Sequence, residues 1–223
     1  MRQKDPYNYL EDGTVTGIVK FSLLFTMQKR MKPYVAGSLL WTLSFLIMPF
    51  LFANGYLKRV PEAVKHGGEL PEFDRPRKLL VQGIQVTVFN GIYVAVQAAL
   101  GLPAYLYPGA VSFVFSGISV GFIFYLYLAM LGIQTEEGTV HTYTSGWRDA
   151  AEKAFTWVYL RAMVIYVVSV IDDIFILIIS MHLPFPLSWL LPAFFFYYFF
   201  MYTYSVAPLL RMKQTGRLGE IRN

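Results

Sequence analysis

Two adjacent carboxylates, Asp172 and Asp173, lie inside a long apolar stretch and are the residues best suited to chemistry. An ionised carboxylate at the centre of a membrane helix costs on the order of 2.5–3.5 kcal/mol on insertion scales. Two full charges side by side in a bilayer interior are still less favourable, so we expect one carboxyl to be protonated or the pair to share a cation. The pair is therefore a candidate proton or cation site.

Two other interpretations of the carboxylate pair remain open. The helix can break at the pair, which would place the carboxylates at the membrane surface, or tyrosine hydroxyls can satisfy them. Neighbouring residues on a helix point about 100° apart, so a single partner cannot serve both carboxylates. No histidine or third carboxylate stands at ligand spacing in the same stretch, so the sequence predicts no metal site.

A polar stripe runs along the apolar segment at residues 79–100. Asn90, Tyr93 and Gln97, together with Gln82, fall within about 80° of one another on a helix. Such a stripe is unfavourable against lipid, so it must face other helices or a wet cavity. Hydrogen bonding between helices and a conduction path are both open. Asn90, Tyr93 and Gln97 are also candidate companions of the carboxylate pair.

The densest charge in the chain lies at residues 55–78, between two apolar runs. Its basic side chains are candidates for contact with anionic lipid headgroups or phosphate. These residues are Lys58, Arg59, Arg75, Arg77 and Lys78. Nearby acidic residues offset much of this charge, so control of membrane topology together with ion pairs inside the segment is the alternative interpretation. We expect the segment to be ordered, with Arg59 paired to a nearby acid.

Several function classes are excluded by what the sequence lacks. There is no cysteine, which removes disulfides, thiolate nucleophiles and cysteine-based metal sites, and there are three histidines. No Walker loop, GxSxG, HExxH or GxGxxG motif is present. The net charge of +5 comes mostly from Lys and Arg beside apolar runs, where they orient a protein against anionic lipid rather than bind nucleic acid. We therefore predict no catalytic residues, no cofactor and no nucleic-acid partner.

The composition identifies the elements that must position these residues. Apolar residues make up 56% of the chain and charged residues 15%, against roughly 45–50% and 25% in soluble domains. The apolar residues lie in runs near or above the ~18 residues that mark a membrane helix. The sequence predicts an all-α polytopic protein with about five transmembrane helices, at residues 34–54, 79–100, 109–133, 154–181 and 187–209.

Three regions follow from these spans. Residues 1–33 form an N-terminal polar and interfacial segment, residues 34–211 a transmembrane helical domain, and residues 212–223 a basic C-terminal tail. The apolar run at residues 14–27 is shorter than the ~20 residues that a spanning helix needs, so we expect an interfacial helix there. Whether residues 14–32 cross the membrane stays open.

The third predicted span contains a GxxxG pattern at Gly117 and Gly121. Small residues at this spacing let two helices approach closely, in one chain or between chains. The pattern makes Gly117 and Gly121 a candidate contact with a partner helix. The lipid bilayer is the other expected partner.

The distribution of Lys and Arg predicts the orientation in the cell membrane. With five spans, residues 55–78, residues 134–153 and the C-terminus share one side, and they hold most of the basic residues. The positive-inside rule places that side in the cytoplasm. The N-terminus then lies outside, although its own basic residues weaken this assignment.

Residues 47–83 carry a pattern that resembles a known family. Its parts are Ile47-Met48-Pro49, Gly55-Tyr56-Leu57-Lys58-Arg59-Val60, Gly67, Glu69-Leu70-Pro71-Glu72-Phe73-Asp74 and Gly83. This pattern resembles the DUF4013 family, multi-spanning membrane proteins found mostly in archaea and without an assigned biochemical function. The resemblance implies a helical membrane fold and says nothing about activity. The family usually has an apolar fourth span, where this chain places Asp172 and Asp173.

These observations favour a non-enzymatic integral membrane protein. We expect a small transport or membrane-organising component, or a subunit of a membrane assembly. The alternative is an intramembrane enzyme that acts on lipid. Such an enzyme should show two or more ionisable groups converging on one lipid-open cavity, whereas a structural subunit should show a large apolar face without a cavity.

Overall fold

Four helices of the protein are long and apolar enough to cross a membrane: α4 (Pro76–Leu106), α5 (Ala110–Glu137), α8 (Trp157–Ser180) and α9 (Leu187–Gln214). The computed structural model describes residues 6–10, 13–26, 31–44, 46–66 and 70–222. It is 86% helical, with no strand among those residues. The protein is thus an all-α polytopic membrane protein, as the sequence predicts.

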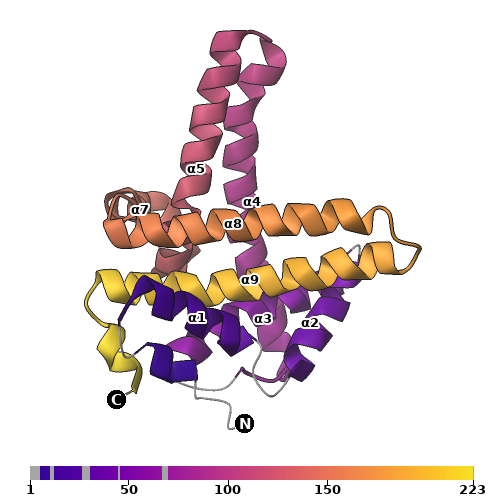
Figure 1. The fold of residues 1–223 in the computed structure, drawn as a ribbon, viewed down its shortest axis with the longest axis vertical. Helices are drawn as coiled ribbons and strands as arrows, with labels where there is room; N and C mark the ends of the chain where they lie inside the picture. The colour runs from indigo at the N-terminus through magenta and orange to yellow at the C-terminus, as the bar shows by residue number, and fades with distance from the viewer. Residues whose placement is uncertain (1–5, 11–12, 27–30, 45, 67–69, 223) are drawn as a thin grey trace.

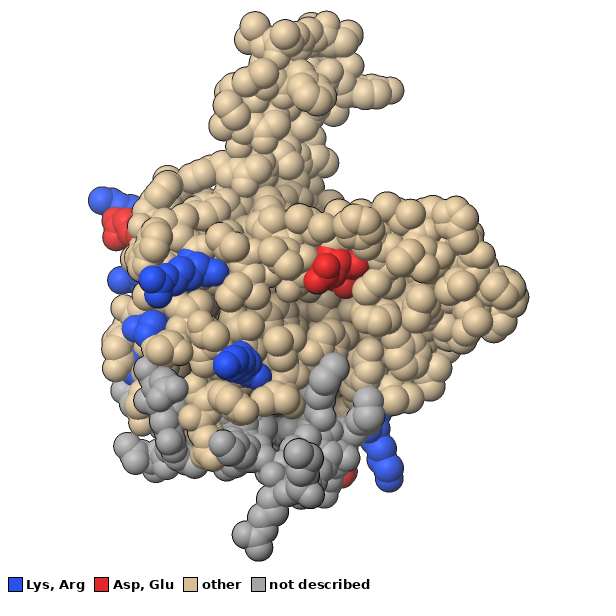
Figure 2. All heavy atoms as spheres, viewed as in Figure 1, with Lys and Arg blue, Asp and Glu red and all other residues tan. Residues whose placement is uncertain are grey.

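The four long helices form two antiparallel hairpins, α4–α5 and α8–α9 (Figure 1). The α4–α5 hairpin projects away from the other helices, and its outer half carries no charged side chain (Figure 2). Large apolar side chains there are open to the surroundings, with Tyr105 and Val111 each 84% exposed. In water such a surface would be costly, and in a bilayer it meets acyl chains, so this hairpin fits a membrane environment.

The first predicted span, residues 34–54, is wrong as a single helix. The chain instead forms α2 (Met31–Thr42) and α3 (Ile47–Lys65), separated by a turn. Pro49 lies in the first turn of α3, where proline is tolerated, so it does not kink a helix. Neither α2 nor α3 has the length and apolar character of the four candidate spans.

The predicted loop at residues 55–78 is also partly helical, because α3 continues through its charged residues to Lys65. The reason lies in the partner helix. The side chain of Lys58 donates to Gln85, and Nε of Arg59 donates to Oε1 of Gln82 at 3.2 Å. The glutamine side chains of α4 thus accept hydrogen bonds from the charged side chains of α3. Neither segment alone indicates that the two helices pair in this way.

Two glycines set the contact between α3 and α4. A Cβ atom on Gly55 would lie 1.9 Å from the carbonyl oxygen of Leu79, and one on Gly83 would lie 1.9 Å from that of Leu51. Real side chains never come that close to backbone, so any residue other than glycine forces the helices apart. The two glycines lie on facing helices, and each leaves space for the backbone of the opposite helix.

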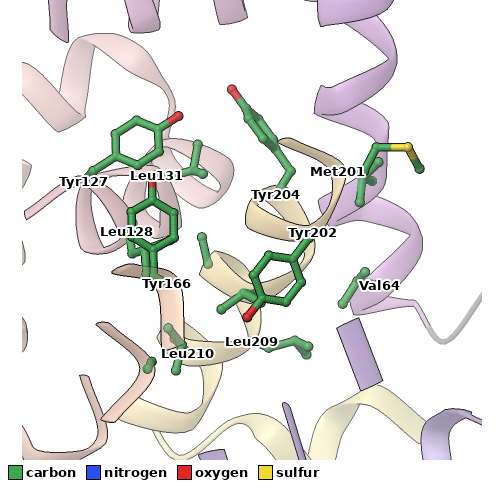
Figure 3. Packing of buried hydrophobic residues seen from close by; sticks show 14 of the residues in the cluster. Val64, Tyr127, Leu128, Leu131, Tyr166, Met201, Tyr202, Tyr204, Leu209 and Leu210 are labelled. Atoms are coloured by element: carbon green, nitrogen blue, oxygen red, sulfur yellow. The ribbon is translucent and has the colours of Figure 1, made fainter. Parts of the chain in front are cut away.

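The centre of the fold is α9, which packs against α1 (Val15–Thr26), α2, α3, α5 and α8. Tyr197, Met201 and Tyr204 of α9 are fully buried, and they belong to one core cluster with Tyr127 and Leu131 of α5, part of which is drawn in Figure 3. A third close approach occurs here, because a Cβ on Gly132 of α5 would lie 3.0 Å from the carbonyl oxygen of Ala207. These contacts hold the two hairpins together.

The predicted interfacial helix at residues 14–27 is present as α1, and it is more deeply packed than an interfacial helix would be. Ile18, Phe21 and Phe25 are fully buried, and α1 contacts both α8 and α9. The side chain of Lys213, near the end of α9, donates to the carbonyl oxygen of Gly13. The start of α1 therefore lies beside the C-terminal end of α9.

The second polar segment, residues 134–153, is mostly helical. The helix α5 runs to Glu137, and the short helices α6 (Thr139–His141), η2 (Thr142–Gly146) and α7 (Trp147–Ala154) follow. The hydroxyl of Thr156 then accepts from the backbone N–H of Tyr159 at 3.4 Å and caps the start of α8. Two further one-turn helices, η1 (Pro6–Tyr9) and η3 (Leu218–Arg222), lie near the termini.

Candidate intramembrane carboxylate site

Asp172 and Asp173 lie well inside α8, which continues without a break to Ser180. The stretch around them is rich in Val and Ile, and its apolar side chains allow a helix that faces lipid or other helices on every side. The helix therefore does not end at the pair, and this removes the first alternative to an intramembrane position. Figure 2 shows one acidic patch over α8 with uncharged residues around it, and Asp172 and Asp173 are the acidic residues of that helix.

The two carboxylates have different surroundings. Asp173 is buried, with 8% of its surface exposed, whereas Asp172 is exposed. Within the described part of the chain, Oδ2 of Asp173 has no hydrogen-bond partner. A buried polar atom without a partner loses its hydrogen bonds to water and forms no others, which costs free energy. A proton or a cation bound at Asp173 would offset that cost.

The pair lines a hollow of about 450 Å³ between α1, α8 and α9. The other residues of its wall are Leu23, Ser169, Phe175, Ile176, Phe195, Tyr198, Phe199 and Tyr202. No Lys, Arg or His is among the described residues that line it. The negative charge of the pair is therefore not balanced by a basic group of the hollow.

Two hydroxyl groups of the hollow donate to backbone carbonyl oxygens rather than to the carboxylates. The Tyr198 hydroxyl donates to the carbonyl oxygen of Leu23 at 3.4 Å, and Ser169 Oγ donates to that of Ile165 at 3.0 Å. Both bonds use the hydroxyl proton. Neither residue satisfies Asp173, so in the described structure these hydroxyls do not provide the tyrosine pairing that the sequence left open.

The structure does not bring Asn90, Tyr93 and Gln97 to the carboxylates. Asn90 accepts from the Tyr127 hydroxyl at 3.1 Å and lies 3.4 Å from the Tyr204 hydroxyl, while Gln97 Nε2 donates to Tyr93 Oη at 3.1 Å. Tyr93 in turn donates to the carbonyl oxygen of Ile123 at 3.2 Å. The polar stripe thus joins α4 to α5 and α9 by hydrogen bonds between helices.

The basic residues of the charged segment form a second site at the junction of α3 and α4. Arg59 is buried, and its guanidinium contacts the carboxylate of Asp74, the carbonyl oxygen of Glu72 at 3.1 Å and that of Asp74 at 3.0 Å. The Tyr56 and Phe73 rings stack at 4.2 Å between centroids. The segment is thus ordered over its described residues, 55–66 and 70–78, and residues 67–69 lie outside the described part of the chain. The expected pairing of Arg59 with an acid is confirmed.

A hollow of about 370 Å³ lies beside this junction, lined by basic and acidic side chains together. Arg75 and Lys78 line it and are exposed, as is the neighbouring Arg77, whereas Lys58 is bound to Gln85 and Arg59 to its own partners. Glu62 and Asp74 are in the same wall. The site has little excess positive charge, so the observed role of Arg59 is structural.

Replacing Arg59 with alanine should destabilise the protein by about 2–3 kcal/mol, because hydrogen bonds from a charged group that is buried are among the stronger ones. Arg77→Ala should change stability by less than about 0.5 kcal/mol, since Arg77 is exposed. Thermal unfolding in detergent compares the two variants. Equal midpoints would contradict the buried network around Arg59.

The Arg59–Asp74 pair also predicts a response to acid. The hydrogen bond from Arg59 holds the pKa of Asp74 below its ordinary value of 3.8. The folded state therefore binds the proton less readily than the unfolded state, so the stabilisation is complete above pH 3.8 and is lost as the pH falls below it. Unfolding midpoints measured from pH 6 to pH 3 should fall more steeply for the wild type than for Asp74→Asn.

A cluster of ion pairs that the sequence did not reveal joins the charged ends of the hairpins. Arg211 of α9 contacts Glu136 at 3.4 Å, Glu137 at 3.2 Å and the carboxylate of Asp149. Glu136 also accepts from Arg217 at 2.8 Å. The one available signal was that acidic residues end the α5 segment while basic residues end the α9 segment.

Comparison with known proteins adds no relative. A scan against family models, a search of curated proteins and a search of solved structures each found no match.

Proposed function

We propose that this protein is a small membrane transport component that binds a proton or another cation at Asp173. The observation that supports the proposal is a buried carboxylate oxygen without a partner on Asp173, a residue of an apolar helix that lines a hollow between α1, α8 and α9. Ionisable groups at membrane depth are costly and mark ion pathways or proton relays. Asp172, at the exposed edge of the same hollow, is suited to deliver the cation to Asp173.

Cation-dependent stability tests this function. A ligand that binds the folded state raises the unfolding midpoint, and the rise continues with the logarithm of the ligand concentration above Kd. We expect Na⁺, K⁺ or acidification from alkaline to neutral pH to stabilise the wild type and to have no such effect on Asp173→Asn. Glu152→Gln is the matched control, because it removes an exposed carboxylate of α7 far from the hollow. An identical response of wild type and Asp173→Asn would contradict the proposal.

An intramembrane enzyme that acts on lipid is the second candidate, because two carboxyl groups do line one hollow. Both come from a single helix, however, and the described lining holds no histidine or lysine to act as a base. Ser169 is already bonded to its own helix. Release of fatty acid or headgroup from defined lipids by the purified protein, abolished by Asp173→Asn, would favour this candidate over transport.

The resemblance to the DUF4013 family enters the proposal through structure rather than chemistry. The residues that carry it include Gly55, Arg59, Asp74 and Gly83, and these meet at the α3–α4 junction. Such clustering supports the interpretation that the pattern specifies how two helices pack. Membership of the family, and with it an archaeal type of protein, remains part of the proposal.

A partner helix at Gly117 and Gly121 also belongs to the proposal. A Cβ on either glycine would meet nothing within 4 Å among the described residues of this chain. The pair is therefore not used for packing here and is free to contact another membrane helix. This supports a subunit of a larger assembly.

We further propose that the charged ends of both hairpins face the cytoplasm of the cell. The contact between Lys213 and Gly13 supports an N-terminus on that same side, rather than outside as five spans would require. The chain has no cysteine, so one introduced thiol reports on one position. Cysteine at Tyr107, in the turn between α4 and α5, should react with an impermeant reagent on intact cells, and cysteine at Arg77 should react after permeabilisation. The reverse pattern would contradict this orientation.

A further inference from the structure

Aromatic rings make up half of the lining of the hollow beside Asp173. They are Phe175 on α8 and Phe195, Tyr198, Phe199 and Tyr202 on α9. Rings attract cations through their electron-rich faces, and this attraction grows when water is excluded. We infer that the hollow binds a lipophilic organic cation, that is, an ammonium or phosphonium centre carrying apolar groups. This inference rests on the proposed cation site and names the chemical class of its ligand.

The lining argues for an organic rather than a metal cation as the main ligand. Hard metal ions require six or more oxygen ligands in a compact shell. The described lining offers two carboxylates, and no group of three or more His, Cys, Asp or Glu side chains that could hold a metal ion occurs among the described residues. Leu23 and Ile176 complete an apolar wall. A ligand with one positive charge and apolar substituents satisfies both parts of this surface.

The size and opening of the hollow suit such a ligand. Its volume of about 450 Å³ lies within the roughly 300–1,000 Å³ of small-molecule sites. Asp172 is exposed at the edge, and Asp173 is buried behind it. The exposed faces of α8 on either side are apolar, with Ile171 and Phe175 open to the surroundings. A lipophilic cation dissolved in the bilayer therefore has a direct route to the carboxylates.

No basic side chain described here competes for the carboxylates. The single basic residue of α8, Arg161, lies three turns earlier with its guanidinium 5.2 Å from the centre of the Trp157 ring. The titratable groups near Asp173 on its own helix are Asp172 and Tyr166. Those on α9 are Tyr198 and Tyr202, and the lining residue from α1, Leu23, is not titratable. The negative charge of the two carboxylates is therefore available to a ligand.

Equilibrium binding of radiolabelled methyltriphenylphosphonium to the purified full-length protein in detergent tests the inference. Triphenylphosphine oxide is the neutral probe of similar shape. We expect saturable binding at one site per chain, at least about tenfold weaker in Asp173→Asn, since loss of a desolvated charge contact costs more than 1.4 kcal/mol. Glu152→Gln should bind like the wild type, and the neutral probe should not compete.

A second variant keeps the test decisive if Asp173→Asn does not fold. Phe199→Leu retains apolar volume and removes one ring, and it should weaken binding about threefold by loss of a cation–π contact. Equal binding to wild type and both variants, or equal competition by the neutral probe, would overturn the inference. A site that responds to Na⁺, K⁺ or protons through Asp173 but does not bind the phosphonium would overturn it too, and would leave the proposed function standing.

Discussion

Gly83→Ala should prevent α3 and α4 from packing as they do in the native protein, and Gly55→Ala should act in the same way. Each substitution places a methyl group 1.9 Å from a backbone carbonyl oxygen of the facing helix. Backbone cannot move aside as a flexible side chain can, so the helices must separate and the hydrogen bonds of Arg59 and Lys58 to α4 are strained with them. We expect each variant to lose free energy of unfolding at or above the upper end of the about 1–3 kcal/mol that is typical of overpacking.

Gly91→Ala is the matched control for these two variants. It lies on the same helix as Gly83, and a Cβ there meets nothing within 4 Å in the described structure. Alanine should stabilise that position by about 0.5–1 kcal/mol, because glycine is a poor helix former. Thermal unfolding in detergent gives the comparison. If Gly83→Ala matched Gly91→Ala, the close approach of α3 and α4 would be contradicted.

The second large effect concerns stability at the carboxylate site. In alkaline buffer without added cation, Asp173→Asn should raise the free energy of unfolding by about 1–3 kcal/mol, because it removes a buried charge that has no partner. Asp172→Asn should change the free energy of unfolding less than Asp173→Asn does, since Asp172 is the exposed member of the pair. Destabilisation by Asp173→Asn would mean that the carboxylate has a partner, and that the site is structural.

The long apolar helices could be predicted from the sequence because each needs no information beyond its own residues. The segments at 79–100, 109–133, 154–181 and 187–209 correspond to α4, α5, α8 and α9. The segment at 34–54 could not be resolved, because an apolar run does not show where a turn interrupts it. The charged start of the 55–78 segment is helical because Gln82 and Gln85 of α4 receive Arg59 and Lys58. That match depends on helix pairing.

The sequence predicts the two carboxylates of the candidate site but not the residues around them, because those come from other helices. Asp172 and Asp173 are anomalous within their own helix, so the sequence alone identifies them. Their surroundings come from α1 and α9, and periodicity within α8 says nothing about which helices cover it. The polar stripe with Asn90 was a plausible companion by composition, and it lies against α5 and α9 instead. Likewise, the sequence shows an acidic end of α5 and a basic end of α9, but it does not indicate that Arg211 contacts Glu136 and Asp149.

Infrared difference spectroscopy of the protein in lipid tests the central claim most directly, since it detects the protonated carboxyl group itself. The account predicts a carboxyl C=O band that appears on acidification, disappears when a bound cation displaces the proton, and is absent from Asp173→Asn. Asp172→Asn should retain the band. A band that persists in Asp173→Asn, or the absence of any carboxyl signal that responds to protons or cations, would contradict a cation site at Asp173.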